Sequence, residues 1–259
     1  MHHGQLAVNE NITCLATAFT FVVLQQHTQS FMKKIGILGG ISHYTTIEYY
    51  NRLMSLYKVQ YGNIDYPEII IYSLSHGLFK EYEDHQQMDK YVCYVSYGIE
   101  KLISAGAEVI ALAANSPHRV FDILQSKFEI PMVSAVESVL KESQRLKIKK
   151  GLLLGIKFTM QSTFYQDKFR HAGIELITPD NEEQEIINNI IFNKLINGQN
   201  IDLDSKNQML EIISNYSVDG IILGCMRLPV FFNNNTVPGL NLVNNLDKHI
   251  ETILEEAKR

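Results

Sequence analysis

A cysteine and an arginine stand close together after an apolar run, in the stretch DGIILGCMRLP at residues 219–229. An ionised thiol can take a proton from carbon or attack an electrophile. We expect the Arg227 guanidinium to lower the pKa of Cys225 and to attract an anionic substrate by gripping its carboxylate. Two alternatives stay open, because Cys225 is also typical of a small core residue and Arg227 of a surface arginine paired with an acid.

A second polar cluster follows another apolar run, in the stretch AANSPH at residues 113–118. Asn115 and Ser116 can donate hydrogen bonds from their side chains and from backbone N–H groups. His118 can hold or release a proton near neutral pH, or it can orient the loop, and both roles stay open. The cluster fits a cleft that binds a carboxylate.

Three further residues fit the same carboxylate-binding cleft. Ile41 and Ser42 follow the turn Gly39-Gly40, where the amides at a helix N-terminus favour anions. Lys157 stands at the corresponding position in the second half of the chain, where it can bind a carboxylate or remain a solvated surface lysine. The glycine turn lacks the G-x-G-x-x-G spacing, so it is not the dinucleotide-binding fingerprint.

Strands and helices alternate along the chain. The expected strands span residues 33–40, 68–75, 108–114, 130–134, 151–154, 174–178 and 220–223. The expected helices span residues 45–57, 88–105, 119–127, 135–146, 161–172, 182–195, 205–215 and 244–258. This alternation predicts an α/β fold with short parallel sheets flanked by helices.

The two halves of the chain resemble one another. KKIGILGGI at residues 33–41 aligns with KKGLLLGIK at residues 149–157 at an offset of 116, and Tyr49 and Tyr165 stand nearby in register. EVIALAAN at residues 108–115 aligns with DGIILGCM at residues 219–226 at an offset of 111. These pairs predict two similar domains related by pseudo-two-fold symmetry, with the site between them. Ligands of open parallel sheets bind beyond the carboxyl ends of the strands, so Ala114 and Cys225 are expected to meet across one cleft.

The expected domains are an extension at residues 1–31, a first α/β domain at 32–134, a second at 135–236 and a C-terminal helix at 237–259 that packs back on the first. The apolar stretch at residues 12–24 is too short to span a bilayer. No lysine or arginine precedes it, which disfavours a secretory signal. Met32 opens a typical start, MKKIGILGG, so we interpret residues 1–31 as a poorly ordered extension or an upstream reading of the start codon.

The amino-acid composition limits the classes of protein to which the chain can belong. The chain has 259 residues, 46% of them hydrophobic and 20% charged, as in ordinary globular proteins. A net charge of -5 and a pI near 6.0 leave no basic footprint for nucleic acid. Three scattered cysteines favour a reducing compartment, here taken as the cytoplasm, and no spacing suggests a metal site. Cys93 stands in a helical stretch that favours a packing role. We expect a small-molecule ligand, no membrane or nucleic-acid partner, and a homodimer as the commonest default.

The motifs resemble those of the aspartate/glutamate racemase family, which works without pyridoxal phosphate. The resemblance rests on IGILGGISHYTTIEYYNRL at residues 35–53, AANSPH at 113–118, FTMQSTFY at 158–165 and LGCMRLP at 223–229. It covers nearly all of residues 32–259 in the family's order. The resemblance implies a cofactor-independent racemase or epimerase that acts at the Cα of an acidic amino acid, aspartate or glutamate.

The family uses two cysteines on opposite faces of the substrate, one to remove the Cα proton and one to return a proton. Its first cysteine stands in a Cys-Asn-Thr-x-His pattern, where this chain reads Ala-Asn-Ser-Pro-His at residues 114–118. Its second stands in Gly-Cys-Thr-Glu-Leu-Pro, where this chain reads Gly-Cys-Met-Arg-Leu-Pro at residues 224–229. Cys225 is therefore retained, Ala114 replaces its partner, and Met226 removes a hydroxyl that could bind substrate. We expect impaired racemisation, with His118, Ser116 or a water as the substitute.

Two other functions fit the missing cysteine. In a one-cysteine decarboxylase, loss of carbon dioxide generates the carbanion, so Cys225 alone suffices as the proton donor. In a non-catalytic protein that binds dicarboxylates or amino acids, the changes at Ala114, Met226 and Arg227 reflect relaxed catalytic constraint.

Overall fold

The computed structural model describes residues 32–62, 66–195, 202–232 and 236–258. The chain divides into the units Met1–Met32 and Lys33–Arg259, and the described strands and helices all belong to the second unit. The predicted extension at residues 1–31 lies outside the described residues.

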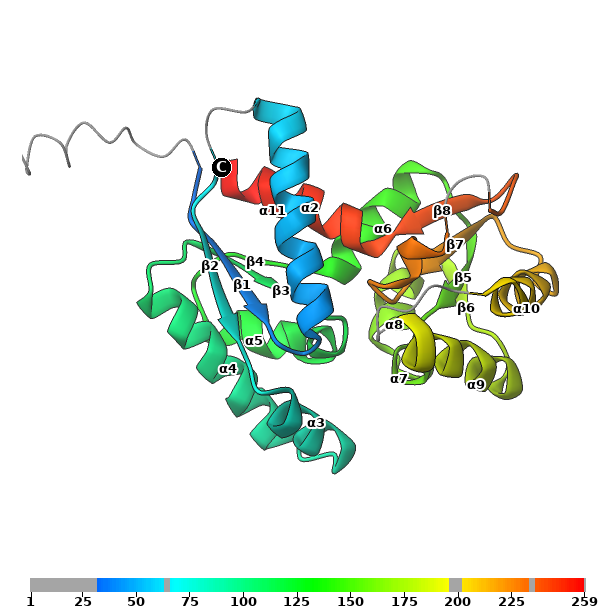
Figure 1. Cartoon of the computed structure of the whole chain (residues 1–259), viewed down its shortest axis with the longest axis horizontal. Helices are drawn as coiled ribbons and strands as arrows, with labels where there is room; N and C mark the ends of the chain where they lie inside the picture. Colours follow the sequence, from blue (N-terminus) through cyan, green and yellow to red (C-terminus); the bar gives the residue numbers. More distant parts are fainter. Residues whose placement is uncertain (1–31, 63–65, 196–201, 233–235, 259) are drawn as a thin grey trace, which may run out of the picture. The chain divides into compact units, whose positions relative to one another are not determined.

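A four-stranded parallel sheet occupies the first half of this unit (Figure 1). Its strands are β1 (Ile35–Gly39), β2 (Ile69–Ser73), β3 (Val109–Leu112) and β4 (Met132–Val133). They lie in the order β2-β1-β3-β4, and Ile35 pairs with Ile69 on one side and with Val109 on the other. β1 and β3 are therefore the central strands, and their carboxyl ends face the same edge of the sheet.

A second four-stranded parallel sheet repeats this arrangement. Its strands are β5 (Lys150–Leu154), β6 (Glu175–Ile177), β7 (Gly220–Leu223) and β8 (Asn241–Asn244). Their order is β6-β5-β7-β8, so β5 corresponds to β1 and β7 to β3. The predicted fold, two parallel sheets flanked by helices, is confirmed, and the repeated strand order agrees with the duplication seen in the sequence. The domain boundaries themselves stay a prediction.

Helices connect the strands and cover the sheets. The helices are α2 (His43–Tyr61), α3 (His76–Asp84), α4 (Met88–Ser104), α5 (Phe121–Lys127), α6 (Ala135–Arg145), α7 (Lys157–Gln161), α8 (Phe164–His171), α9 (Asn181–Ile190), α10 (Leu203–Ser214) and α11 (Asn245–Lys258). Shorter turns are η1 (Ser116–Val120), the π-turn η2 (Ile191–Leu195) and η3 (Leu228–Val230). None of the helices in the described residues combines the length and apolar character needed to cross a membrane.

Capping residues fix where several helices begin. The Ser42 hydroxyl accepts a hydrogen bond from the Thr45 amide and starts α2. Asp180 and Glu183 form a reciprocal capping box at the start of α9. Such side chains satisfy amides that the first helical turn leaves unpaired, and each is worth about 1 kcal/mol.

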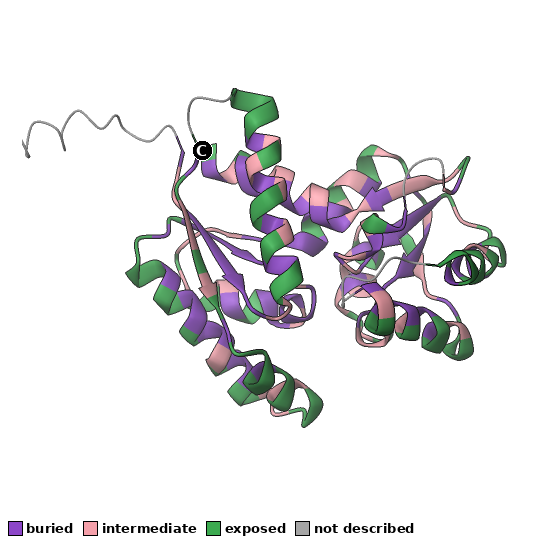
Figure 2. Cartoon of the chain, in the orientation of Figure 1, coloured by how far each residue is buried: buried purple, intermediate pink, exposed green. Residues whose placement is uncertain are grey.

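The core lies on both faces of the central strands. Every residue of the central strands β3 and β7 is buried (Figure 2). Parallel strands covered by helices on both sides are apolar at every position, which explains why these two read as unbroken hydrophobic runs.

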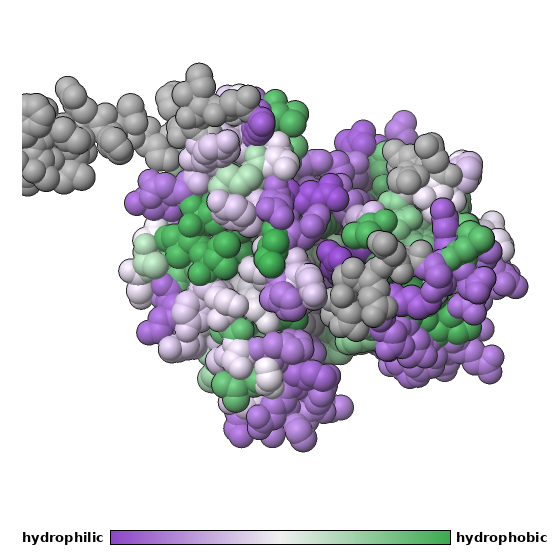
Figure 3. Space-filling view, in the orientation of Figure 1, coloured by the Kyte–Doolittle hydropathy of each residue, from purple (hydrophilic) through white to green (hydrophobic). Residues whose placement is uncertain are grey.

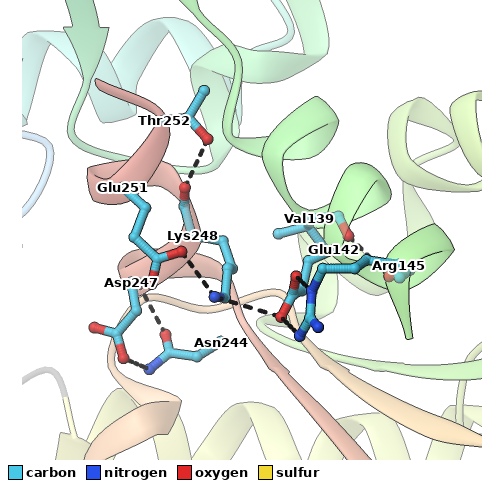
Figure 4. A network of polar contacts seen from close by, with 9 residues as sticks. Val139, Glu142, Arg145, Asn244, Asp247, Lys248, Glu251 and Thr252 are labelled. Carbon is cyan, nitrogen blue, oxygen red and sulfur yellow. Dashed lines mark hydrogen bonds and ion pairs between the residues drawn. The ribbon is translucent and has the colours of Figure 1, made fainter. Parts of the chain in front are cut away.

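The C-terminal helix α11 contacts α2, α6, β3 and β4. Its Lys248 lies 3.4 Å from Glu142 on α6, and Glu142 also accepts two hydrogen bonds from Arg145 (Figure 4). His249 donates from Nε2 to the Val133 carbonyl of β4 at 2.9 Å and accepts from the Tyr49 hydroxyl at 2.6 Å. The helix is thereby held by buried hydrogen bonds on one side and by an ion pair on another.

Candidate active site

The central strands of the two sheets end in loops that touch one another. β3 leads into Ala114 and Asn115, and β7 leads into Gly224 and Cys225. The Asn115 side-chain amide donates a hydrogen bond to the Gly224 carbonyl. Ala114 and Cys225 therefore lie on adjoining loops, each next to one partner of this bond.

Gly224 allows the end of β7 to lie close against β5. A Cβ at this position would lie 2.7 Å from Cδ1 of Leu153 and 3.1 Å from the carbonyl oxygen of Leu154. The Gly224 amide donates to that same carbonyl at 2.6 Å. A side chain at residue 224 would therefore displace the turn that presents Cys225.

Cys225 is half-buried, so it is neither an inert core residue nor an exposed thiol. Burial raises its pKa, and the backbone N–H groups of Arg227 and Leu228 and the Arg227 guanidinium oppose this rise only in part. The Arg227 guanidinium thus lowers the pKa of Cys225, as the sequence predicted, but the net pKa is raised because desolvation of the thiolate outweighs this nearby positive charge.

Arg227 reaches toward the first half of the unit. Its guanidinium lies 6.0 Å from the centre of the Tyr44 ring, and Tyr44 belongs to α2. Its Nε donates to the Leu195 carbonyl at 3.2 Å. Met226, between Cys225 and Arg227, is buried and offers an apolar surface only. Among the described residues, Arg227 is therefore held by a carbonyl and an aromatic face, and no ion pair with an acid is seen there of the kind that the surface-arginine alternative required.

Asn115 is the hub of a buried polar network. Its Oδ1 accepts hydrogen bonds from the Tyr165 hydroxyl at 3.0 Å and from the Asn245 amide at 2.9 Å, while its Nδ2 donates to Gly224. The side chain is thus engaged on both ends. Its predicted donation to a substrate stays a prediction, and in this structure it joins the two loops.

His118 uses both ring nitrogens within the protein. Its Nε2 accepts from the Ala135 amide at 2.9 Å, which leaves the proton on Nδ1, 2.9 Å from the Ala114 carbonyl. Burial lowers its pKa to about 4. A neutral imidazole bonded on both sides has no free proton to exchange near neutral pH. The geometry therefore supports the loop-orienting role and does not support the predicted role as a proton donor.

Lys157 opens α7 and its ammonium pairs with Glu185 on α9. Its backbone amide also donates to Asn188 Oδ1 at 2.9 Å. The predicted carboxylate-binding lysine is thus already bound to a carboxylate of the protein itself.

A cavity of about 630 Å³ adjoins these loops. It brings together three of the predicted substrate-binding residues, namely Ile41, Ser42 and Ser116. Cys225 and Lys157 are not among its lining residues. The predicted set therefore divides between a strand-end group around Cys225 and a cavity group around Ser42 and Ser116.

Sequence reasoning missed the contribution of α3 to this cavity. The helix supplies Phe79 and Glu83 to the lining. Among the described residues that line the cavity, Glu83 is the only one with a carboxylate side chain. The helical spacing of Phe79 and Tyr82 in HGLFKEYED could have indicated it. The described residues contain no group of three or more His, Cys, Asp or Glu side chains placed to share a metal ion.

Known proteins share this fold and these motifs. The family model of Asp/Glu/hydantoin racemases matches residues 38–243. The broad specificity amino-acid racemase RacX of Bacillus subtilis (strain 168) is 31% identical over 156 residues, which cover 59% of this chain and 67% of that protein. An aspartate racemase homologue from Pyrococcus horikoshii OT3 superposes with a TM-score of 0.79 at 34% identity, covering 88% of this chain and 100% of that chain.

More distant structures share the fold alone. Glutamate racemase from Campylobacter jejuni subsp. jejuni superposes with a TM-score of 0.60 at 17% identity, covering 86% of this chain and 85% of that one. The family match and the racemase relatives place the chain among the isomerases, in the racemase class. The chain belongs to the Asp/Glu/hydantoin racemase family, which confirms the resemblance inferred from its motifs.

Proposed function

We propose that this chain racemises or epimerises an amino acid at Cα without a cofactor, and that Cys225 exchanges the proton on one face of the substrate. One combined observation carries the proposal: the family match extends over both halves, and the thiol stands at the end of β7 beside the loop of Ala114. The half-buried position of Cys225 suits a group that must meet a small molecule and still be shielded from water.

The proton transfers can be written for this chain. The Cys225 thiolate takes the Cα proton, and the electron pair left on carbon is delocalised into the substrate carboxylate. A proton delivered to the opposite face then gives the other enantiomer, and the reverse reaction uses the Cys225 thiol as the donor. Ala114 can neither accept nor give a proton, so Ser116 or a water must serve that face. A positioned acid or base is worth about 10²- to 10⁴-fold in rate, so we expect slow two-way turnover.

An acidic substrate is the expectation that the family name and the aspartate racemase homologue support. The name of RacX, a broad specificity racemase, supports a wider search. Lys157, which the sequence offered as a residue that can bind a substrate carboxylate, is paired with Glu185 in this structure. We therefore keep aspartate and glutamate as the first substrates to test and do not limit the proposal to them.

The alternatives draw less support. A one-cysteine decarboxylase and a non-catalytic binder both remain compatible with Ala114, but the named relatives are racemases or racemase homologues. No contact of Cys225 or Arg227 within the described residues favours either alternative over proton exchange.

Deuterium exchange at Cα in D₂O tests the proposal. Both enantiomers of a panel that includes aspartate and glutamate are incubated with the full chain, and exchange is followed by NMR. We expect exchange with the wild type, its loss in Cys225→Ser, and no change in Cys93→Ser. Cys93 is exposed on α4 rather than packed, contrary to the sequence-based expectation, which makes it a matched control thiol.

Ala114→Cys completes the experiment. A second thiol on the adjoining loop is expected to raise racemisation by about 10²-fold or more. If the folded wild type exchanges no amino acid of the panel, the proposal fails. If Cys225→Ser retains full exchange, the assignment of the proton to Cys225 fails.

We also propose a homodimer. β2 is an edge strand of the first sheet, its Ile71 is 42% exposed, and hydrophobic side chains gather over this strand (Figure 3). An exposed apolar edge is a template for association with a second chain. Sedimentation velocity of the wild type, compared with Ile71→Lys, is expected to show loss of a dimer in the variant.

The cytoplasmic location likewise stays a prediction.

A further inference from the structure

The cavity beside the site is large and mostly apolar. Its volume of about 630 Å³ lies within the range of pockets that hold drug-sized ligands, about 300–1,000 Å³. Its apolar and aromatic lining comes from Ile41, Tyr44, Leu74, Phe79, Ile156 and Phe192. A side chain as short as that of aspartate would leave most of this surface uncovered, whereas a long aliphatic chain would bury it.

Glu83 is the unusual polar group in this cavity. It is half-buried on α3, and its Oε1 is buried without a hydrogen bond within the described part of the chain. Burial raises its pKa, while the Ser116 hydroxyl, Arg119 and Lys80 act in the opposite direction. A buried carboxylate oxygen without a partner is costly, and a bound cation would remove that cost.

The nearby cations already have partners. Lys80 also lines the cavity, and its ammonium pairs with Asp84 at 2.9 Å on α3. The Arg119 guanidinium lies 5.0 Å from the centre of the Phe158 ring. An acidic substrate side chain in the cavity would therefore place a second carboxylate near Glu83 and would have to compete with Asp84 for Lys80, whereas a basic side chain would give the unpartnered Oε1 of Glu83 a cation.

Ser116 connects this cavity to the loops at the ends of β3 and β7. It lines the cavity and stands two residues after Ala114, on the loop whose Asn115 bonds to Gly224 beside Cys225. A substrate with its Cα at the strand ends can therefore extend its side chain past Ser116 into the cavity.

We propose that Glu83 selects the substrate side chain, and that the cavity accepts an aliphatic chain that ends in an ammonium or guanidinium group. This inference rests on the proposed function in one respect only: the ligand is an amino acid bound at the strand ends. It replaces the acidic side chain expected from the sequence with a basic one.

Calorimetric binding tests the inference without requiring turnover. The ligands are both enantiomers of lysine, of norleucine, which keeps the aliphatic chain without the charge, and of glutamate. The proteins are the wild type, Glu83→Gln and Glu81→Gln, because Glu81 is an exposed acid on the same helix. Far-UV circular dichroism and thermal unfolding establish that each variant is folded.

We expect the wild type to bind lysine about tenfold or more tightly than norleucine and glutamate, a difference of about 1.4 kcal/mol or more. In Glu83→Gln the affinity for lysine should fall to the affinity for norleucine, and in Glu81→Gln the preference for lysine should be unchanged. The inference is overturned if the wild type prefers glutamate or binds none of the three ligands. It is also overturned if Glu83→Gln weakens the binding of all three ligands equally.

These outcomes separate the inference from the proposed function. Lysine binding without Cα exchange in D₂O would contradict the proposed racemase activity and support the role of Glu83. Exchange confined to aspartate or glutamate would support the activity and overturn the role of Glu83.

Discussion

The Cys225 thiol is protonated at neutral pH in the free protein, because burial raises its pKa above the ordinary value of 9.0. A protonated thiol is ready to donate to a carbanion, whereas removal of the Cα proton needs the thiolate. The Arg227 guanidinium is the charge that favours this thiolate. Substitution of Arg227 should therefore act on the chemistry even though Arg227 is not among the residues that line the cavity.

We expect iodoacetamide to alkylate the exposed Cys93 faster than Cys225 at neutral pH. We also expect the substitution Arg227→Gln to slow the alkylation of Cys225 further. Loss of the guanidinium raises the pKa of Cys225 again, and each pKa unit lowers the thiolate fraction about tenfold. Peptide mass spectrometry measures the two rates separately. Arg170→Gln, on an exposed face of α8, is the control. Faster alkylation of Cys225 in Arg227→Gln would contradict the assigned effect of the guanidinium.

The positions of individual site residues could be predicted from the sequence more readily than their protonation states. The motifs predicted where Cys225, Ser116 and Ser42 stand, because each follows a strand that the hydrophobic pattern makes visible. The protonation states of Cys225 and His118 could not be predicted in the same way. Burial sets both, and it depends on neighbours far away in the sequence, such as Ala135, whose amide binds His118.

At the level of the elements, the duplication gives each half a buried tyrosine in the helices that follow β1 and β5. Tyr49 bonds to Nδ1 of His249, and Tyr165 bonds to Asn115 and Asn245. Both therefore reach α11, so this single helix joins the polar cores of the two halves. The repeat in the sequence predicted the register of the two tyrosines but not their partners, since α11 has no counterpart in the aligned segments.

We expect Tyr49→Phe to destabilise the protein by about 1–3 kcal/mol, because it leaves the buried Nδ1 of His249 without a donor. Tyr165→Phe should cost less, about 1 kcal/mol, because the Asn245 amide still donates to Asn115 Oδ1. Urea unfolding of the two variants checks the order. A larger loss in Tyr165→Phe would mean that Asn245 cannot hold Asn115 in place alone.

The elements that the sequence missed are those set by tertiary contacts. β8 (Asn241–Asn244) is flanked by asparagines and has no strand-like pattern, and its pairing with β7 defines it. The predicted helix 161–172 is instead α7 and α8, because Ser162 adopts an extended backbone and its hydroxyl donates to the Phe158 carbonyl at 2.6 Å. The long, strongly alternating segments were predicted correctly because their own hydrophobic pattern determines them.

At the scale of the whole molecule, two buried histidines couple the fold to pH. Burial lowers the pKa of His118 to about 4 and that of His249 to about 3, from an ordinary value of 6.5. The unfolded chain therefore binds more protons than the folded one between pH 6.5 and about 4. The stability that these histidines contribute is fully present above pH 6.5 and is lost as the pH falls through this window.

We expect the free energy of unfolding of the full chain to decrease on acidification, by up to about 1.4 kcal/mol per pH unit for each histidine. Glu83 and Asp247 have raised pKa values and act in the opposite sense, so the slope of the wild type alone does not isolate the histidines. His249→Gln does, because glutamine can donate to the Val133 carbonyl and accept from Tyr49 but cannot bind a proton.

Urea unfolding from above pH 6.5 down to about 4 should therefore give a shallower slope in His249→Gln than in the wild type. His171→Gln, at an exposed histidine of α8, should leave the slope unchanged. An unchanged slope in His249→Gln would mean that His249 is not held neutral by burial. A fall that persists unchanged in both variants would instead place the acid sensitivity in carboxylates with lowered pKa values, such as those of Glu142 and Asp219, because neither variant alters them.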